Sequence, residues 1–295
     1  MSSPTIIPKE IKSRLRNLPP LPAVIQRLVA LDMHSAGAFD EIVDAAESDP
    51  PLTSKLLGLA NSAGYAPETD ITSIRQAVSR IGAKRLSELI VTMVLNQTFD
   101  PKSIDEKALW SHSILTAIAA RHIALHSAHG VDPQLAYMCG LLHDIGRFVF
   151  FDGVPAEVQR ADEFGWTSAT GLLHAELDSV GIDHTEIGWF AAEHLGLPSN
   201  VGLTIRHHHF MGEPESLPAG LDRPLLTTVQ TAEFIAALLQ STPSPIEMEP
   251  DQVIPFLTSR GEHLEQSLVE LELTDIARLL PEIASEGSKL SDSFG

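Results

Sequence analysis

The 295-residue sequence predicts an all-α protein. Apolar residues recur every three to four positions through nearly every segment, which is the spacing of an amphipathic helix rather than the alternation of a strand. Capping residues and prolines stand between these segments, where helices begin and end. We therefore expect an all-helical chain with two lobes, and an acidic helical extension at the C-terminus.

The first hundred residues read as several short helices with marked boundaries. Prolines, capping residues and one glycine supply these boundaries, at residues 18–22, 48–50, 61–65, 73–76 and 82. Proline restricts its predecessor and removes a backbone donor, whereas Ser and Asp caps satisfy the first free N–H groups of a helix. These signals predict helices over 24–31, 48–59 and 73–81, and a further helix from about residue 84.

A lobe boundary is expected near residue 100, where Pro101 precedes the capping-box spacing of residues 103–106. A long helix follows to about residue 123, and Asp132-Pro133 opens a helix that ends in His143-Asp144. Further helices are predicted over 154–164, 167–180, 184–195, 199–210 and 223–240. After a proline-rich linker, two acidic amphipathic helices extend to about Ser285, and the tail after Glu286 is expected to fray. The predicted division is 1–100, 101–240 and 241–295.

The charge of the chain argues against broad nucleic-acid binding. The net charge is −19, and residues 101–240 alone carry 17 acidic and 7 basic groups. Such a chain repels phosphate backbones at long range. The local basic group of Arg80, Lys84 and Arg85 is expected to be a solvated helix face.

We expect a cytoplasmic protein that does not enter a membrane. No apolar run reaches the roughly 18 residues of a membrane helix, and the first residues lack the order of a signal peptide. Cys139 is the one cysteine, so no disulfide can form within the chain, and we expect it to be a small core residue.

Histidines concentrate in the second lobe, where 11 of 13 lie between His112 and His209. Metal ligands need imidazoles and carboxylates that the fold brings together. The candidates lie at helix ends or on the later helix, at His112, His143, Asp144, His184, His207, His208, His209 and Glu233. Glu176 could hydrogen-bond one of these histidines. The alternative is that some of them cap helices or bond buried carbonyls, and the stripe His122, His126 and His129 is expected to face solvent.

Eight stretches of the chain follow one another in an order and spacing typical of a known family: 18–22, 48–57, 61–65, 74–82, 110–113, 140–146, 184–188 and 205–209. Through them residues 18–240 resemble the HDOD module, a branch of the HD-domain superfamily in bacterial signalling proteins. The resemblance implies an N-terminal helical lobe packed on an HD-domain-like helical lobe. It also implies a module that works as a non-catalytic output or scaffold, often downstream of a receiver domain in a response regulator. By position, His112, His143, Asp144, His184, His208 and His209 match the metal ligands of the catalytic HD-GYP relatives.

Three positions depart from the catalytic pattern. Arg147 stands where the catalytic family has lysine, and a planar guanidinium does not place its charge as an ammonium does. Phe210 follows the His-His pair, and residues 211–214 contain no GYP motif. Glu233 stands where the last aspartate ligand belongs. These departures predict that cyclic dinucleotides are not hydrolysed, because such sites tolerate little misplacement.

The sequence therefore predicts a signalling module that acts through contacts with other signalling proteins and has no catalytic residue. No cofactor is required, although the histidines could hold a divalent ion of iron, manganese, nickel or zinc, with Arg147 and Glu176 beside the ligands. No receiver domain is expected in residues 1–17. The alternatives are a metal-dependent phosphohydrolase and a module that binds a nucleotide or another small ligand without chemistry.

Overall fold

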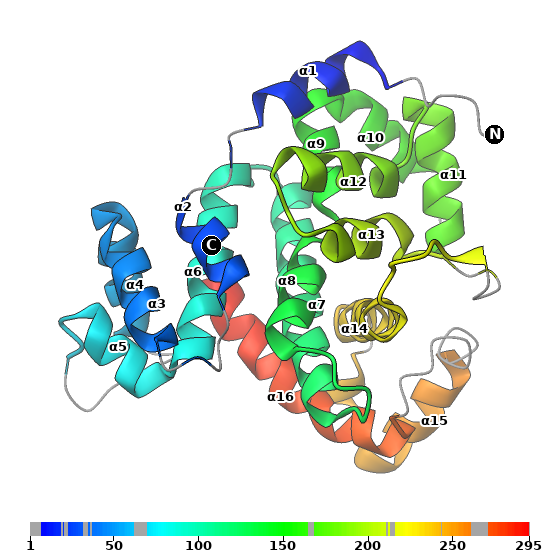
Figure 1. Ribbon diagram of the computed structural model, residues 1–295. Coiled ribbons are helices and arrows are strands. Elements are labelled where there is room, and N and C mark those ends of the chain that lie inside the picture. Colours follow the sequence, from blue (N-terminus) through cyan, green and yellow to red (C-terminus); the bar gives the residue numbers. More distant parts are fainter. Residues whose placement is uncertain are drawn as a thin grey trace. The chain divides into compact units, whose positions relative to one another are not determined.

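The computed structural model describes residues 7–18, 20, 23–31, 35, 37–61, 70–164, 168–210, 212, 216–242, 244–260 and 271–294. These residues form helices and connecting loops, without a β-strand among them (Figure 1). The all-α prediction is confirmed. The predicted stretches at 61–65 and 211–214 lie mostly outside the described residues, as do Pro19, Leu21 and Pro22.

The chain forms two compact units. Unit 1 comprises residues 1–19 and 103–286, and unit 2 comprises residues 20–102 and 287–295. No helix in the described part of the chain is long and apolar enough to cross a membrane.

Unit 2 is a cluster of short helices around a central longer one. Its helices are α2 (Ala23–Ala30), α3 (Ala38–Glu47), α4 (Pro50–Ala60), α5 (Ile74–Ile81) and α6 (Ala83–Phe99). Helix α6 packs against the other four and is buried along most of its length.

The predicted helix starts of unit 2 are largely confirmed. Asp49 caps α4 by accepting from the amide of Leu52 at 3.0 Å. Ser73 caps α5, but Gln76 accepts from the amide of Thr72 and not from that of Ser73, so the predicted capping box is half formed. Gly82 ends α5 with φ of 91°, a conformation that glycine adopts without steric cost.

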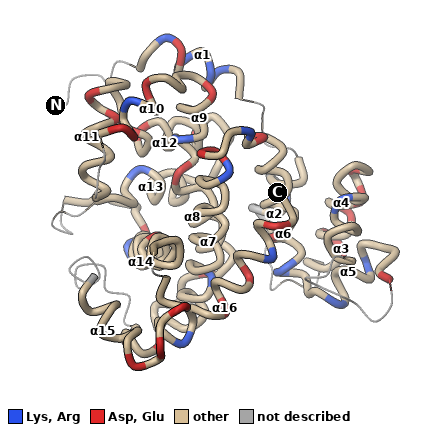
Figure 2. The backbone as a smooth tube through the Cα atoms, turned by 180° about the vertical axis from the view of Figure 1, so that it is seen from behind, with Lys and Arg blue, Asp and Glu red and all other residues tan. Residues whose placement is uncertain are grey.

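Unit 1 holds the remaining helices. They are α1 (Lys9–Asn17), α7 (Ile104–His126), α8 (Pro133–Leu142), α9 (Ile145–Gly153), α10 (Pro155–Glu163), α11 (Ala169–Val180), α12 (His184–His194), α13 (Ser199–His207), α14 (Arg223–Leu239), the 3₁₀ turn η2 (Pro245–Glu247), α15 (Pro250–Arg260) and α16 (Leu273–Asp292), which ends in unit 2. Helices α7, α8 and α14 lie side by side (Figures 1 and 2), and α12 packs against α9 and α13. Cys139 on α8 is fully buried, as predicted.

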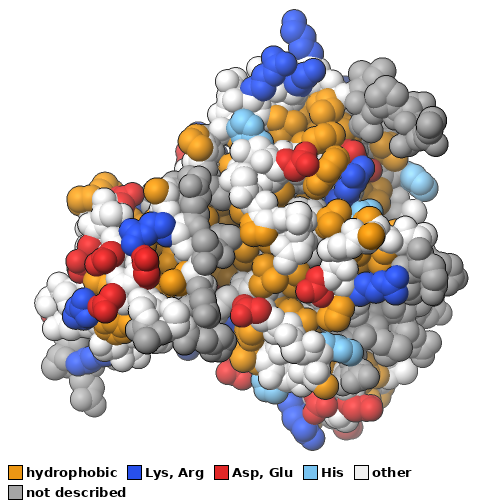
Figure 3. Space-filling model, viewed as in Figure 1, with side chains coloured by type: hydrophobic (Ala, Val, Ile, Leu, Met, Phe, Trp, Pro, Cys, Tyr) orange, Lys and Arg blue, Asp and Glu red, His pale blue; other side chains and the backbone are white. Residues whose placement is uncertain are grey.

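Basic residues recur along α1 (Figure 2), and their side chains gather over it in the space-filling view (Figure 3). This helix buries Ile11 and Leu15 and leaves Lys9, Lys12 and Arg16 exposed. In unit 2, Arg80 and Lys84 are exposed, which agrees with the predicted solvated face. Arg85 is different, because its Nη1 lies 2.7 Å from Oε2 of Glu88, whose side chain is 2% exposed.

Two predictions for the later part of the chain were wrong. The tail after Glu286 does not fray, because α16 continues to Asp292 and Leu290 is buried. The stripe of three histidines does not face solvent as a whole: His122 is buried, and its Nε2 lies 3.1 Å from Oε2 of Glu286 on α16. After the linker the described residues contain the helices α15 and α16, and α15 buries Leu257; residues 261–270 between them lie outside the described residues.

Glycines let the helices that carry the candidate ligands cross closely. A Cβ at Gly140 would lie 2.8 Å from the carbonyl oxygen of Thr116, where α8 crosses α7. A Cβ at Gly146 would overlap the carbonyl oxygen of His184, where α9 meets α12. Because the obstructing atoms belong to the backbone, they cannot move aside as a side chain would.

Gly146→Ala is therefore expected to lower the free energy of unfolding of unit 1 by about 1–3 kcal/mol, the usual cost of overpacking a well-packed contact. Gly153→Ala, on the same helix, is the matched control, since its Cβ would meet neighbours at an ordinary 3.7 Å. Urea unfolding followed by tryptophan fluorescence isolates unit 1, because all three tryptophans lie in residues 103–286. Equal stability of the two variants would contradict the close-contact role of Gly146.

Candidate metal centre

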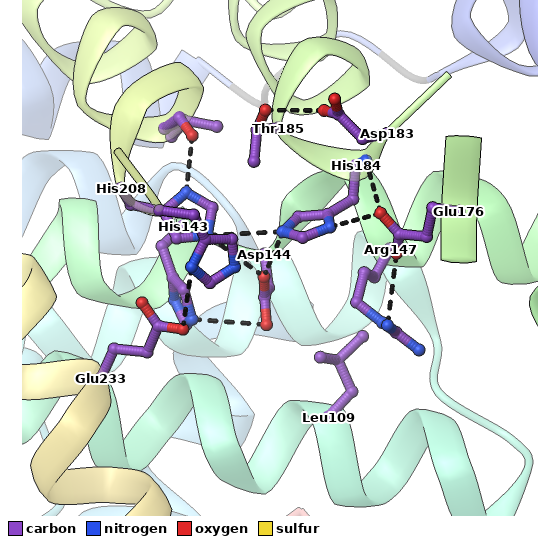
Figure 4. Close-up of polar contacts among 12 residues, drawn as sticks. Leu109, His143, Asp144, Arg147, Glu176, Asp183, His184, Thr185, His208 and Glu233 are labelled. Carbon is purple, nitrogen blue, oxygen red and sulfur yellow. Dashed lines mark hydrogen bonds and ion pairs between the residues drawn. The ribbon is translucent and has the colours of Figure 1, made fainter. Parts of the chain in front are cut away.

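Helix ends bring most of the candidate ligands together in unit 1 (Figure 4). His143 is the C-cap of α8, Asp144 is the N-cap residue of α9, and His184 is the first residue of α12. His208 is the C-cap of α13. The predicted helix that ends in His143-Asp144 is thus followed directly by α9, and the pair occupies the turn between two helices.

Backbone carbonyls orient two of the imidazoles. Nδ1 of His143 lies 2.8 Å from the carbonyl oxygen of Gly140, and Nδ1 of His208 lies 2.6 Å from that of Ile205. A carbonyl oxygen can only accept, so each Nδ1 carries the proton. In the neutral ring the lone pair is then on Nε2, which is the nitrogen left for a metal ion.

Side-chain oxygens orient two further imidazoles in the same way. Nδ1 of His184 lies 2.6 Å from Oε2 of Glu176, which also accepts from the backbone amide of His184 at 2.9 Å. Nδ1 of His112 lies 3.0 Å from Oε1 of Gln240. The predicted contact between Glu176 and a candidate ligand is present. Carboxylate–histidine pairs of this kind fix the ring and raise its basicity as a ligand.

Asp144 lies at the point on which these rings converge. Its Oδ2 is 3.3 Å from Nε2 of His143, and its Oδ1 is 3.3 Å from Nε2 of His184 and 3.6 Å from Nε2 of His208. Nε2 of His143 and Oδ1 of Asp144 are buried without a hydrogen bond.

The Nε2 atoms of His184 and His208 lie 3.4 Å apart, so two lone pairs would face each other if both rings were neutral. A shared cation, either a proton or a metal ion, relieves that repulsion. Buried polar atoms without a hydrogen bond, surrounded by imidazoles whose Nε2 atoms point inward, fit a divalent ion.

The candidate ligands fall into three overlapping sets, in each of which the ligand atoms lie within 4.8 Å of one another. The sets are Asp144, His184, His208 and His209; His112, His143 and Asp144; and His143, His208 and Glu233. All seven predicted metal ligands belong to at least one set. His207 belongs to none of those found among the described residues, and its ring instead meets Phe210 edge to face at 6.2 Å.

Burial and neighbouring charges shift the pKa values of the clustered residues in different directions. Burial lowers the pKa of His112 to about 4, and it raises the pKa of Glu233 to about 7. Burial opposes ionisation of Asp144 as well, but the imidazoles of His143 and His208 hold its pKa well below the usual range. Burial also opposes protonation of His184, yet the Glu176 carboxylate raises the pKa of that ring to about 9. A proton on His184 thus occupies the cluster at neutral pH when no metal ion does.

The metal-free protein is expected to lose about 2 kcal/mol of stability between pH 7 and pH 9. The pKa of His184 is 6.5 in the unfolded reference and about 9 in the folded state. The folded state therefore holds a proton that the unfolded chain releases, which is a stabilisation that is complete below pH 6.5 and lost as the pH rises through 9. Urea unfolding in the presence of a chelator measures this loss. Glu176→Gln should remove the pH dependence, and a flat profile in the unaltered protein would contradict the assignment.

Arg147 lies beside the cluster and faces away from it (Figure 4). Its Nη2 lies 2.9 and 3.0 Å from the two carboxylate oxygens of Asp162, and its Nη1 lies 3.3 Å from Oε1 of Glu176. The guanidinium is buried, which opposes its charge, but the carboxylates of Glu176 and Asp162 raise its pKa above the ordinary value. The positive charge of Arg147 is therefore paired with the carboxylates of Glu176 and Asp162, and Glu176 in turn contacts His184.

The family model of the HDOD domain matches residues 18–211. Similar folds occur in crystal structures of an HDOD domain protein from Geobacter sulfurreducens (TM-score 0.69, 24% identity, 96% of this chain and 99% of that one) and of a predicted phosphohydrolase from Shewanella amazonensis SB2B (TM-score 0.72, 22% identity, 97% and 98%). A predicted signal transduction protein from Marinobacter aquaeolei VT8 is also similar (TM-score 0.71, 22% identity, 99% and 63%). At these identities the likeness shows the fold.

A curated relative, an uncharacterized protein of Treponema pallidum (strain Nichols), is 27% identical over 263 residues. The match covers 88% of this chain, which spans about half the length of that relative.

Proposed function

Because the chain belongs to the HDOD family, we propose that it is a signalling module that holds a divalent metal ion in unit 1 and acts through contacts with other proteins. The observation that carries the metal-binding part is the common orientation of four imidazoles. His112, His143, His184 and His208 each have Nδ1 held by an oxygen acceptor, so that each can offer Nε2.

The residues fit one ion or two. Asp144, His184, His208 and His209 would hold the first. His112 and His143, with Asp144 shared, would hold a second. Imidazole and carboxylate ligands suit iron, manganese, nickel and zinc. When bound, such an ion supplies Lewis-acid polarisation and lowers the pKa of a bound water.

The position of Arg147 supports a role without hydrolysis. A phosphohydrolase stabilises the charge that develops on phosphorus with a cation placed for that purpose. The guanidinium of Arg147 is instead paired with Asp162 and Glu176. Instead of the lysine of the catalytic relatives, this position holds an arginine that contacts Glu176, the carboxylate that orients the His184 ring.

Metal analysis and hydrolase assays on the purified full chain test this proposal together. We expect iron, manganese, nickel or zinc to bind in stoichiometric amounts, and no turnover of phosphodiester or phosphomonoester substrates with metal restored. Turnover that Asp144→Ala abolishes would overturn the non-catalytic part. A protein that binds none of the four metals would overturn the metal-binding part.

A metal-dependent phosphohydrolase is the second candidate. It is favoured by the way Asp144 faces different imidazoles with its two oxygens, because a carboxylate shared by two ions is suited to clamping a phosphate. The name of the Shewanella amazonensis relative points the same way. The assay above separates the two candidates directly.

A further inference from the structure

Asp162 is a partly exposed residue near the end of α10, and its carboxylate binds the buried side chain of Arg147. Both of its carboxylate oxygens lie within 3.0 Å of Nη2 of Arg147. The side chain of Arg147 is 8% exposed, whereas that of Asp162 is 36% exposed. Asp162 therefore connects a partly solvent-exposed carboxylate to the buried guanidinium of Arg147.

Arg147 and Glu176 continue this link to the metal centre through separate atoms. Nη1 of Arg147 contacts Oε1 of Glu176 at 3.3 Å, and Oε2 of Glu176 accepts from both the amide and Nδ1 of His184. Glu176 and His184 are almost completely buried. Each carboxylate oxygen of Glu176 thus has its own partner, and the second oxygen fixes the ring of a candidate ligand.

We propose that Asp162 is a positioning residue for the metal centre, which acts through Arg147 and Glu176 on His184. This inference rests on the proposed metal-binding function. Asp162 binds Nη2 of Arg147 and so fixes the orientation of the guanidinium. In this orientation Nη1 of Arg147 contacts only Oε1 of Glu176, and Oε2 of Glu176 remains available to His184.

Without the Asp162 carboxylate, the guanidinium would turn onto both oxygens of Glu176, because arginine favours bidentate pairing with a carboxylate. Nδ1 of His184 would then compete with Arg147 for Oε2 of Glu176. The orientation of the ring would no longer be fixed, and Nε2 would not stay directed at Oδ1 of Asp144, 3.3 Å away. Metal ligands that lose such support bind more weakly.

Loss of one negative charge could weaken cation binding by itself, and the chain offers a matched control for that effect. Glu163 follows Asp162 on the same helix, is exposed, and accepts from Nε2 of Gln159 at 3.2 Å. Glu163→Gln removes the same charge without touching Arg147. An exposed charge is screened by solvent and salt, so this control should change the affinity for zinc by less than about twofold.

The test measures zinc affinity of the full chain by competition with a chromophoric chelator at fixed pH and salt. Asp162→Asn should weaken binding about tenfold, the lower end of the range for residues behind metal ligands, and Asp162→Glu should recover most of that loss. In a Glu176→Gln background, Asp162→Asn should have no further effect, because the path runs through Glu176. The inference is overturned if Asp162→Asn lowers the zinc affinity equally with Glu176 present and in the Glu176→Gln background, or lowers it in neither. Thermal unfolding of each variant shows whether it is folded.

Nitrogen NMR of the metal-free protein tests the same path without zinc. The ring nitrogens of His184 should shift in Asp162→Asn and stay unchanged in Glu163→Gln. If the unaltered protein binds none of iron, manganese, nickel and zinc, the proposed metal-binding function fails, and the NMR comparison still decides whether Asp162 positions His184. Ring signals that are unchanged in Asp162→Asn would overturn the inference.

Discussion

Asp144→Ala is expected to weaken metal binding by more than about 100-fold. Changes behind a metal ligand already cost 10–100-fold, and Asp144 would be a direct ligand in two of the three ligand sets. It also contributes the negative charge around which the imidazoles of His143, His184 and His208 converge. Removing it leaves the set of His143, His208 and Glu233, so weak residual binding is expected. Isothermal titration with zinc or manganese measures the change.

His129→Ala is the control for Asp144→Ala, because His129 is an exposed histidine of the same unit. Its loss should leave the affinity unchanged, which shows that the metal is not held by surface histidines. Equal affinity in the unaltered protein and Asp144→Ala would place the ion elsewhere and contradict the ligand sets.

The candidate ligands could be predicted from the sequence because few residue types bind metal ions. Once the chain is all-helical, imidazoles and carboxylates at helix ends are the natural candidates, and His143, Asp144, His184 and His208 prove to lie together. The helix starts could be predicted for a similar reason, since the side chains of Asp132 and Ser103 satisfy backbone amides within three residues.

Glu176 could be predicted as the partner of a candidate ligand. Asp162 and Gln240 could not, because their roles depend on contacts with residues distant in the sequence. Asp162 is 15 residues from Arg147, and Gln240 is 128 residues from His112. Nothing in their type distinguishes them from ordinary surface residues. His122 was misread for the same reason, since its burial depends on α16, 164 residues away along the chain.

The C-terminal tail shows how burial outweighs local preference. Chain ends tend to fray, and the glycine and serines of this tail disfavour a helix. Ile283 and Leu290 are spaced seven residues apart, so they share one face of a helix, and both are buried. The free energy gained from burying that face exceeds the small propensity cost, and α16 reaches Asp292.

Arg147→Met is expected to lower the free energy of unfolding of unit 1 by about 3–5 kcal/mol, the usual cost of removing one partner of a buried ion pair. The substitution leaves the buried Glu176 carboxylate without the guanidinium, and it removes the contact of both Asp162 carboxylate oxygens with Nη2. Urea unfolding followed by tryptophan fluorescence measures the loss.

Two further variants show that this cost arises from an uncompensated buried charge. Arg160→Met is the matched control, because Arg160 is 58% exposed and its ion pair with Glu157 should contribute no more than about 1 kcal/mol. Adding Glu176→Gln to Arg147→Met should recover a large part of the stability, since the buried carboxylate that needs a cation is then gone. If Arg147→Met and Arg160→Met were equally stable, the buried contact between Arg147 and Glu176 would not stabilise unit 1, and the interpretation of Arg147 beside the His-Asp turn would have to change.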